Sequence, residues 1–288
     1  MPASIRLRPT VPAALAVVLV AAAAVTAACS PDSEPDPAAS CIEAPDRPLT
    51  GTAGPSAEAP DGGGLRVVES GVTIVPPVRR PGSATASIGV IVENTSRYVA
   101  YRTRVSFDVR DGAGDTVVVG DGGGTVLLEV PLLLPGARSG VGTAVYVDEA
   151  ADAADRVEVD TTLGATTWVE HRPDEVAGVT TTHDRTTIVD AESHSGIVYY
   201  RMASPYCTGL FTRGVGTIFR DATGQIVGGS IDGDKGPGRC DPDQAEQLTD
   251  VIRSVPAQFD DSRTESYPYC DFGPAPSSPG WSTAAPFN

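Results

Sequence analysis

The sequence predicts an all-β protein made of two related antiparallel β-sandwiches in tandem. The first observation is an alternation of apolar and polar residues with period two in several short segments, which is typical of half-buried strands. The second is an internal repeat, in which residues 88–120 return in recognisable form as residues 198–228. The third is a composition of 31 Gly and 25 Pro, which favours many short strands joined by turns.

The first predicted domain spans residues 65–171. Its expected strands cover residues 65–75, 88–93, 98–110, 125–134, 141–147 and 156–161. A turn that contains glycine joins the third of these strands to residues 115–119, which predicts a hairpin. Because the strands are closely spaced and no long amphipathic helix lies between them, they predict an antiparallel sandwich.

The second predicted domain spans residues 172–272 and follows a short, charged junction at residues 171–175. It opens with a Thr-rich strand over residues 176–189. Residues 241–255 predict one short helix, because Pro242 follows an Asp cap and apolar residues recur at helical spacing. Residues 273–288 are rich in Pro and Ser and predict a disordered tail.

Three short motifs in the first domain resemble a known family. Residues 107–111 (FDVRD) are similar to the Phe-x-Leu-Tyr-Asp motif of the FxLYD-type domain, with Val109 and Arg110 in place of its Leu and Tyr. Residues 92–96 (VENTS) and 134–136 (LPG) resemble two turns of that family, and residues 217–221 keep part of the first motif. The resemblance implies immunoglobulin-like β-sandwiches of a kind common in bacterial surface lipoproteins. It implies an architecture rather than an activity.

The FDVRD segment also has a structural role that depends on no family. Phe107 and Val109 alternate along a strand and are predicted to face the core. Asp111 is expected to accept hydrogen bonds from backbone N–H groups of the following turn. Gly114 is expected to supply the positive φ that closes this turn.

The charge of the chain argues against a nucleic-acid partner. The 288 residues carry a formal net charge of −16 and a sequence pI of about 4.5, with acidic residues scattered along the chain. Such a surface repels phosphate groups, since proteins bind nucleic acid largely through Lys and Arg. The simplest explanation of the negative charge is that it keeps an exported protein soluble.

Residues 1–28 have the composition of an export signal. Arg6 and Arg8 give a positive start, residues 11–25 are uncharged and apolar, and Ala27 and Ala28 are the small residues that a signal peptidase needs. The apolar run is shorter than the roughly 20 residues of a membrane-spanning helix. We therefore expect a cleaved signal peptide.

Residues 26–30 (TAACS) resemble the bacterial lipobox, in which the Cys becomes the lipid-bearing N-terminus. The resemblance implies lipidation of Cys29 and attachment to the outward face of the cell membrane. Thr26 stands where the family has an aliphatic residue, and ordinary secretion is the alternative. Residues 29–64 have few large apolar side chains and predict a disordered tether.

The other four cysteines predict two disulfides in an oxidising compartment. They are Cys41, Cys207, Cys240 and Cys270. Sequence alone leaves three connectivities open, and the interpretation we favour pairs Cys207 with Cys240 and Cys41 with Cys270. The long spacings and the absence of a C-x-x-C pair do not fit a zinc site.

No catalytic pattern is recognisable in the sequence. The three histidines are His171, His183 and His194, and neither a Gly-x-Ser-x-Gly motif nor a nucleotide-binding loop occurs. The adjacent pair His183 and Asp184 is better explained by an exposed histidine on a strand or loop than by catalysis. We therefore expect no enzyme activity and no cofactor.

Aspartates on loops are the best candidates for a calcium site. They are Asp232 and Asp234 in one segment, and Asp111, Asp115 and Asp121 around the first hairpin. Asp-Gly is common turn chemistry, however, and the EF-hand spacing does not occur. We therefore predict no metal site.

These observations predict a lipid-anchored protein of the bacterial cell envelope with a non-catalytic binding or scaffolding role. Its expected partners are the membrane, through Cys29, and an envelope protein or a surface ligand. The alternative is a ligand- or calcium-binding extracytoplasmic sensor or carrier. The sequence does not determine the oligomeric state.

Overall fold

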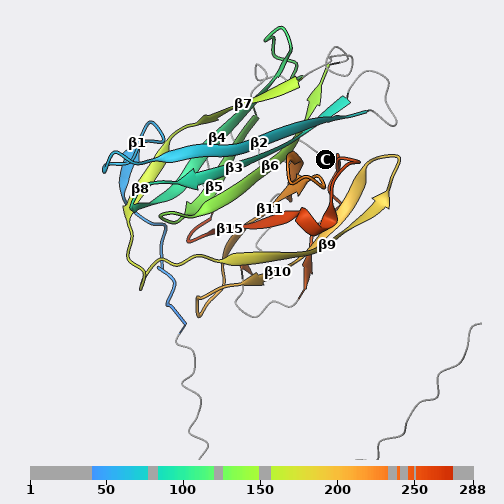
Figure 1. The fold of residues 1–288 in the computed structure, drawn as a ribbon. Helices are drawn as coiled ribbons and strands as arrows, with labels where there is room; N and C mark the ends of the chain where they lie inside the picture. Colours follow the sequence, from blue (N-terminus) through green and yellow to red (C-terminus); the bar gives the residue numbers. More distant parts are fainter. Residues whose placement is uncertain are drawn as a thin grey trace, which may run out of the picture. The chain divides into compact units, whose positions relative to one another are not determined.

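The computed structural model is all-β, as the sequence predicts, and its sheets are antiparallel (Figure 1). The structure describes residues 41–76, 84–119, 126–148, 157–232, 239–240, 246–249 and 251–274. The predicted signal peptide, Cys29 and the tail from residue 275 onward lie outside the described residues.

Two sheets of the first half pack face to face around an apolar core. One sheet has the order β2-β3-β6, and the other has the order β1-β8-β4-β5 with β7 also paired to β4. Alternating residues such as Ile88 and Phe107 fill the space between them and are almost fully buried. The strands are β1 (Thr52–Gly54), β2 (Leu65–Val75), β3 (Ala84–Asn94), β4 (Tyr98–Asp111), β5 (Val126–Leu133), β6 (Arg138–Val147), β7 (Val157–Leu163) and β8 (Thr166–Glu170).

The second half also contains two sheets. One has the order β14-β10-β9, and in the other β11 pairs with β12, β13 and β15. Val198, Phe219 and Ile252 form the core between them. The elements are β9 (Thr180–Asp190), β10 (Ser195–Ala203), β11 (Leu210–Arg220), β12 (Ile226–Asp232), β13 (Arg239–Cys240), β14 (Gln247–Leu248), the 3-10 helix η1 (Asp261–Arg263) and β15 (Glu265–Asp271).

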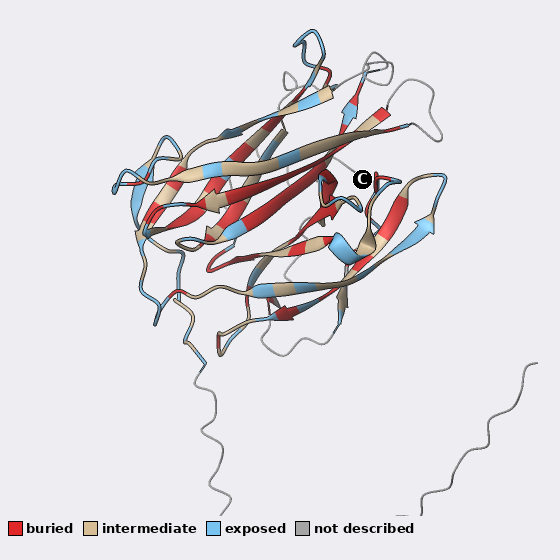
Figure 2. Ribbon diagram, in the orientation of Figure 1, coloured by how far each residue is buried: buried red, intermediate tan, exposed pale blue. Residues whose placement is uncertain are grey.

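The two halves meet through glycine-lined sheet faces, where backbone approaches backbone. A Cβ added at Gly142 of β6 would lie 2.5 Å from the carbonyl oxygen of Thr217 in β11. One added at Gly229 of β12 would lie 2.6 Å from the carbonyl oxygen of Ile88 in β3. β3 is consequently buried along almost its whole length (Figure 2). The glycines of this interface are Gly71, Gly89, Gly140, Gly142, Gly216, Gly228 and Gly229.

This interface corrects the predicted division into two separate domains. Residues 41–288 group as one compact unit, so the expected boundary at residue 171 does not divide independent bodies. An ion pair of 2.5 Å between Arg220 of β11 and Glu69 of β2 links the halves as well. The two halves are related in sequence, and each covers a sheet face of the other.

The internal repeat is most exact at its two turns. Asp111 Oδ1 accepts hydrogen bonds from the N–H groups of residues 113 and 115, as the sequence predicts, and Asp221 Oδ1 accepts from those of residues 223 and 225. Gly114 and Gly224 close the turns with φ of 89° and 91°. The predicted inward orientation of Phe107 is also confirmed, since it is 1% exposed.

Two of the motifs that resemble the FxLYD family lie against each other. The buried Asn94 donates hydrogen bonds from Nδ2 to the carbonyl oxygens of Tyr98 and Leu133, and its own carbonyl oxygen accepts one from Gly136 N–H. Its Oδ1 accepts from the Ser96 backbone and hydroxyl. These contacts satisfy the polar atoms of a buried side chain.

The predicted tether is wrong for residues 41–64. β1 pairs with β8 through Thr52 and Trp168, and Ile42 forms a bridge with Tyr206. Few large apolar side chains are needed here, because the segment is held by backbone pairing and a disulfide. Residues 29–40 lie outside the described residues.

The predicted helix is wrong wherever residues 241–255 are described. Gln247 and Leu248 form strand β14, and Thr249 and Ile252 hydrogen-bond through their backbones to β10. Edge pairing with β10 satisfies these backbone groups and overrides the helical spacing of the apolar residues.

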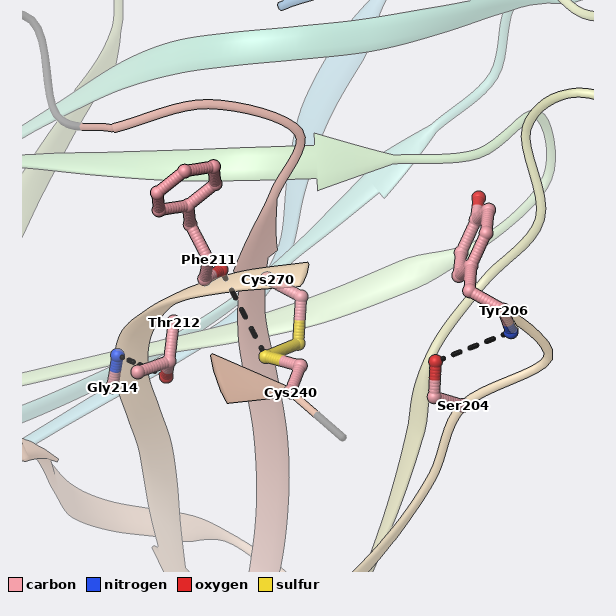
Figure 3. The surroundings of a disulfide bond; sticks show 7 residues. All are labelled: Ser204, Tyr206, Phe211, Thr212, Gly214, Cys240 and Cys270. Atoms are coloured by element: carbon pink, nitrogen blue, oxygen red, sulfur yellow. Dashed lines mark hydrogen bonds between the residues drawn. A yellow bond between two sulfur atoms is a disulfide. The ribbon is translucent and has the colours of Figure 1, made fainter. Parts of the chain in front are cut away.

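Both disulfides form, but their pairing differs from the expected one. Cys41 bonds to Cys207, and Cys240 bonds to Cys270 (Figure 3). The bridge at Ile42 carries Cys41 to the neighbourhood of Cys207. β13 and β15 both pair with the first residues of β11, which brings Cys240 beside Cys270.

We predict that Gly142→Ala destabilises the protein, because the new methyl group has no space between β6 and β11. The free energy of unfolding should fall by about 1–3 kcal/mol, as for other overpacked cores. Gly164→Ala is the matched control, since its Cβ would lie 3.6 Å from the nearest atom. Urea unfolding of both variants measures the difference. Equal losses in the two variants would contradict the interface.

Candidate functional site

The histidine and carboxylate that adjoin in sequence have separate partners in the structure. His183 Nε2 lies 3.0 Å from Asp261 Oδ1, whereas Asp184 pairs with Arg201 at 2.9 Å. The His183 side chain is only 7% exposed, which corrects the expectation of an exposed strand residue. His183 belongs to β9 and Asp261 to η1, so their contact connects these two elements.

Of the aspartates considered for calcium, Asp111 has a structural contact that explains its position. Asp111 Oδ1 is used by the turn of the first hairpin. Asp121 and Asp234 lie outside the described residues. Among the residues that the structure describes, no three His, Cys, Asp or Glu side chains are grouped so that they could hold a metal.

A charge network between the two halves is centred on Asp271 of β15, which is fully buried. Its Oδ1 accepts hydrogen bonds from the Tyr101 hydroxyl at 2.5 Å and from Gly273 N–H at 3.2 Å. Its Oδ2 accepts from Arg102 Nε at 3.0 Å and from Arg213 Nη2 at 2.5 Å. The two arginines compensate the buried charge, which is unfavourable without partners.

An unusual backbone conformation at Arg102 brings two adjacent side chains to the same carboxylate. Its φ is 52°, in the left-handed region that costs a non-glycine residue roughly 1–2 kcal/mol. Strand alternation shifts here, so that Ala100 and Val105 both face the first-half core, five positions apart. Tyr101 and Arg102 therefore both reach Asp271.

The neighbouring strand β5 shifts its alternation at the corresponding place. Val130 and Leu133 both face the first-half core, while Leu132 packs into the core between the halves. The irregular position lies at Pro131, which has no N–H group to pair with β4. The matched irregularities keep β4 and β5 in constant register.

Glu129 of β5 extends the network toward the surface. Its side chain is 10% exposed, and its Oε1 lies 3.7 Å from Arg213 Nη2. This oxygen is buried without a hydrogen bond among the described residues. Burial raises the pKa of the Glu129 carboxyl, and the positive charges of Arg213 and Arg102 oppose that rise. Burial and the bond to Asp271 also raise the pKa of Tyr101, so its hydroxyl remains a donor at neutral pH.

A pocket of about 250 Å³ lies beside the network. It crosses four neighbouring strands on the face of the β1-β8-β4-β5 sheet that is turned away from the first-half core, because Arg104 and Glu129 alternate with core residues. Small side chains leave the space, and polar groups line it. The lining residues are Ala53, Gly54, Arg102, Arg104, Glu129, Ala165, Thr166 and Thr167.

None of these residues was predicted from the sequence as part of a site. The available signal was a charged residue within an apolar strand, as with Glu129 in the run VLLEVPLLL and Asp271 in YPYCDF. The sequence could not predict that these residues group together, because Tyr101 and Asp271 lie 170 positions apart in the chain.

A scan against protein-family models finds no match, and a search of curated proteins finds no similar sequence.

Within the described residues, no helix is both long and apolar enough to cross a membrane.

The raised pKa of Glu129 predicts a pH-dependent loss of stability. The folded state holds this proton more tightly than the unfolded state, whose pKa is near 4.5. The free energy of unfolding should therefore fall as pH rises from 4.5 through the folded pKa.

Glu129→Gln has no proton to lose at this position. Measured by urea unfolding between pH 4 and 7, the stability of the wild type relative to Glu129→Gln should decrease with pH. If this difference in stability stays constant or rises with pH, burial does not disfavour the ionised form of Glu129.

Proposed function

We propose that this chain is an outward-facing, lipid-anchored protein of a bacterial cell envelope with a non-catalytic binding role. The observation that carries the proposal is the use of the cysteines. Four of the five pair with one another, which leaves Cys29 without a cysteine partner in the sequence. Cys29 is also the residue that follows the signal-like segment and two small residues.

The disulfides support an extracytoplasmic location, because such bonds persist in oxidising compartments. Each lies within the described structure and joins segments distant in sequence, with separations of 166 and 30 residues. An exported protein of this kind gains stability mainly because the crosslinks constrain its unfolded state.

Immunoglobulin-like sheets of the FxLYD type are the finer fold that we propose. Support comes from the inward Phe107, the turn at Asp111, and the contact between Asn94 and Gly136. In such sheets the framework is rigid and binding is assigned to exposed faces and loops.

The polar pocket is the feature that favours binding as the role. Arg102, Arg104 and Glu129 line one space, and polar groups in a concavity provide specificity for a small ligand. The same observation favours the second candidate, a ligand-binding sensor or carrier. Calcium has less support, since Asp111 is already engaged in a turn.

Lipid attachment is tested by membrane fractionation and intact-mass measurement of the wild type, Cys29→Ala and the control Ser30→Ala. We expect the wild type and Ser30→Ala to be in the membrane fraction with a lipid-modified N-terminus at Cys29. Cys29→Ala should lack this modification. Without reductant, the other four cysteines should resist alkylation.

An unmodified Cys29 in a released wild-type protein would contradict the anchor. The chain would then be a secreted protein, and the disulfide evidence for export would still hold.

A further inference from the structure

We infer that the disulfide between Cys41 and Cys207 is a site of thiol–disulfide exchange, and that its reduction by a dithiol releases residues 41–51 from the second half. These residues, the strap, lead from Cys41 to β1. The inference goes beyond the proposed binding role and does not depend on the lipid anchor. It depends on the different exposure of the two disulfides and on how the strap is attached.

The two disulfides differ in their accessibility to a reductant. Cys41 is exposed and Cys207 is partly exposed, whereas Cys240 and Cys270 are only 0% and 5% exposed. The buried disulfide also joins two strands, β13 and β15, that both pair with β11. An attacking thiolate must reach one of the two sulfur atoms, so access limits the rate of exchange. A reductant should therefore break the bond between Cys41 and Cys207 first.

The exchange proceeds in two steps. A thiolate of the reductant attacks Sγ of Cys41, which forms a mixed disulfide and releases the Cys207 thiolate. The second thiolate of the reductant then attacks its own sulfur in the mixed disulfide and releases the Cys41 thiolate. The two cysteine thiolates take up the two protons that the dithiol has lost. The protein disulfide thus gains two electrons, and the dithiol becomes a disulfide.

Backbone hydrogen bonds and apolar contacts hold the strap beside this disulfide. Ile42 N–H donates to the carbonyl oxygen of Pro205 at 2.9 Å, and Cys207 N–H donates to the carbonyl oxygen of Ile42 at 2.9 Å. Both bonds involve residues next to the crosslink or within it, so the crosslink keeps their donors and acceptors together. Single hydrogen bonds of this kind contribute modestly to stability. Once the crosslink is broken, this end of the strap should open locally.

The strap covers part of the apolar core between the halves. Ile42, Ala44 and Leu49 pack against this core, and Tyr206 and Phe272 belong to it. The rings of Tyr206 and Phe272 are almost fully buried and pack edge to face, with centroids 5.6 Å apart. Release of the strap removes contacts from this core, while β1 stays paired with β8. The reduced form therefore exposes an apolar surface that the oxidised form covers.

The first test is stepwise reduction of the full chain in detergent by dithiothreitol, without denaturant. Samples are alkylated at intervals, and each cysteine is followed by peptide mass spectrometry. We expect Cys41 and Cys207 to become alkylated at least tenfold faster than Cys240 and Cys270. Equal rates for the two pairs, or faster reduction of the buried pair, would overturn the exchange site.

The second test asks whether reduction releases the strap. In the form reduced and alkylated at Cys41 and Cys207, the amides of Ile42 and Cys207 should exchange with deuterium at least tenfold faster than in the oxidised form. Hydroxyl-radical labelling of Tyr206 and Phe272 should also rise. Amides of β3 should exchange at an unchanged rate, which shows that the body stays folded. Unchanged exchange at Ile42, or unchanged labelling of the two rings, would overturn the release.

A variant separates the crosslink from the reductant. Cys41→Ser combined with Cys207→Ser should show fast exchange at Ile42 without reductant, and dithiothreitol at the concentration that acts on the wild type should not change it. Asp46→Asn is the matched control, because it alters an exposed strap residue and keeps the disulfide. Its exchange at Ile42 should stay within twofold of the oxidised wild type. Equal increases in the two variants would overturn the role of the disulfide.

The outcome is independent of the anchor, because Cys29 takes no part in the exchange. Lipid attachment is measured by intact mass on the same preparation. A protein with lipid on Cys29 but without selective reduction removes this inference alone. A protein with an unmodified Cys29 and a selectively reduced Cys41 removes the anchor alone.

Discussion

Close contact between two glycine-lined sheet faces is the constraint on which the rest of this structure depends. β3 and β6 can approach β11 and β12 to backbone distance only because residues such as Gly142 and Gly229 carry no Cβ. Such an approach excludes water and gives the central sheet two buried faces, which is why β3 is apolar or small along nearly its whole length. A Cβ at these glycine positions would collide with the backbone of the other half.

The charge network depends on that contact. β15 belongs to the second half, yet its Asp271 pairs with Tyr101 and Arg102 of the first. A buried carboxylate without partners is unfavourable. The network therefore stabilises only the arrangement in which β4, β11 and β15 meet. The disulfide between Cys240 and Cys270 fixes the strand residue next to Asp271. The pocket lies beside this junction, and Arg102, which lines it, is turned toward Asp271 by a left-handed backbone conformation.

Local patterns predicted much of the secondary structure but not how the halves combine. The strand at Leu65–Val75 was predicted with its observed bounds, because alternation and the prolines that follow it are local signals. The turn at Asp111 was predictable for the same reason. The disulfide pairing and the grouping around Asp271 depend on contacts between distant segments, which no local pattern records. The total glycine content was interpreted as a sign of turns, and the close contact at the interface glycines was not predicted. The helix expected over residues 241–255 was wrong because edge pairing with β10 satisfies the backbone.

The shared glycine interface makes the two halves one cooperative unit, and hydrogen exchange in increasing urea tests this most directly. If the account is correct, amides of β3 and β6 and amides of β11 and β12 should exchange through one common opening. Their free energies and their dependence on urea should agree, since neither half retains its buried face without the other. Two distinct openings, in which one half loses protection while the other remains fully protected, would contradict the shared interface.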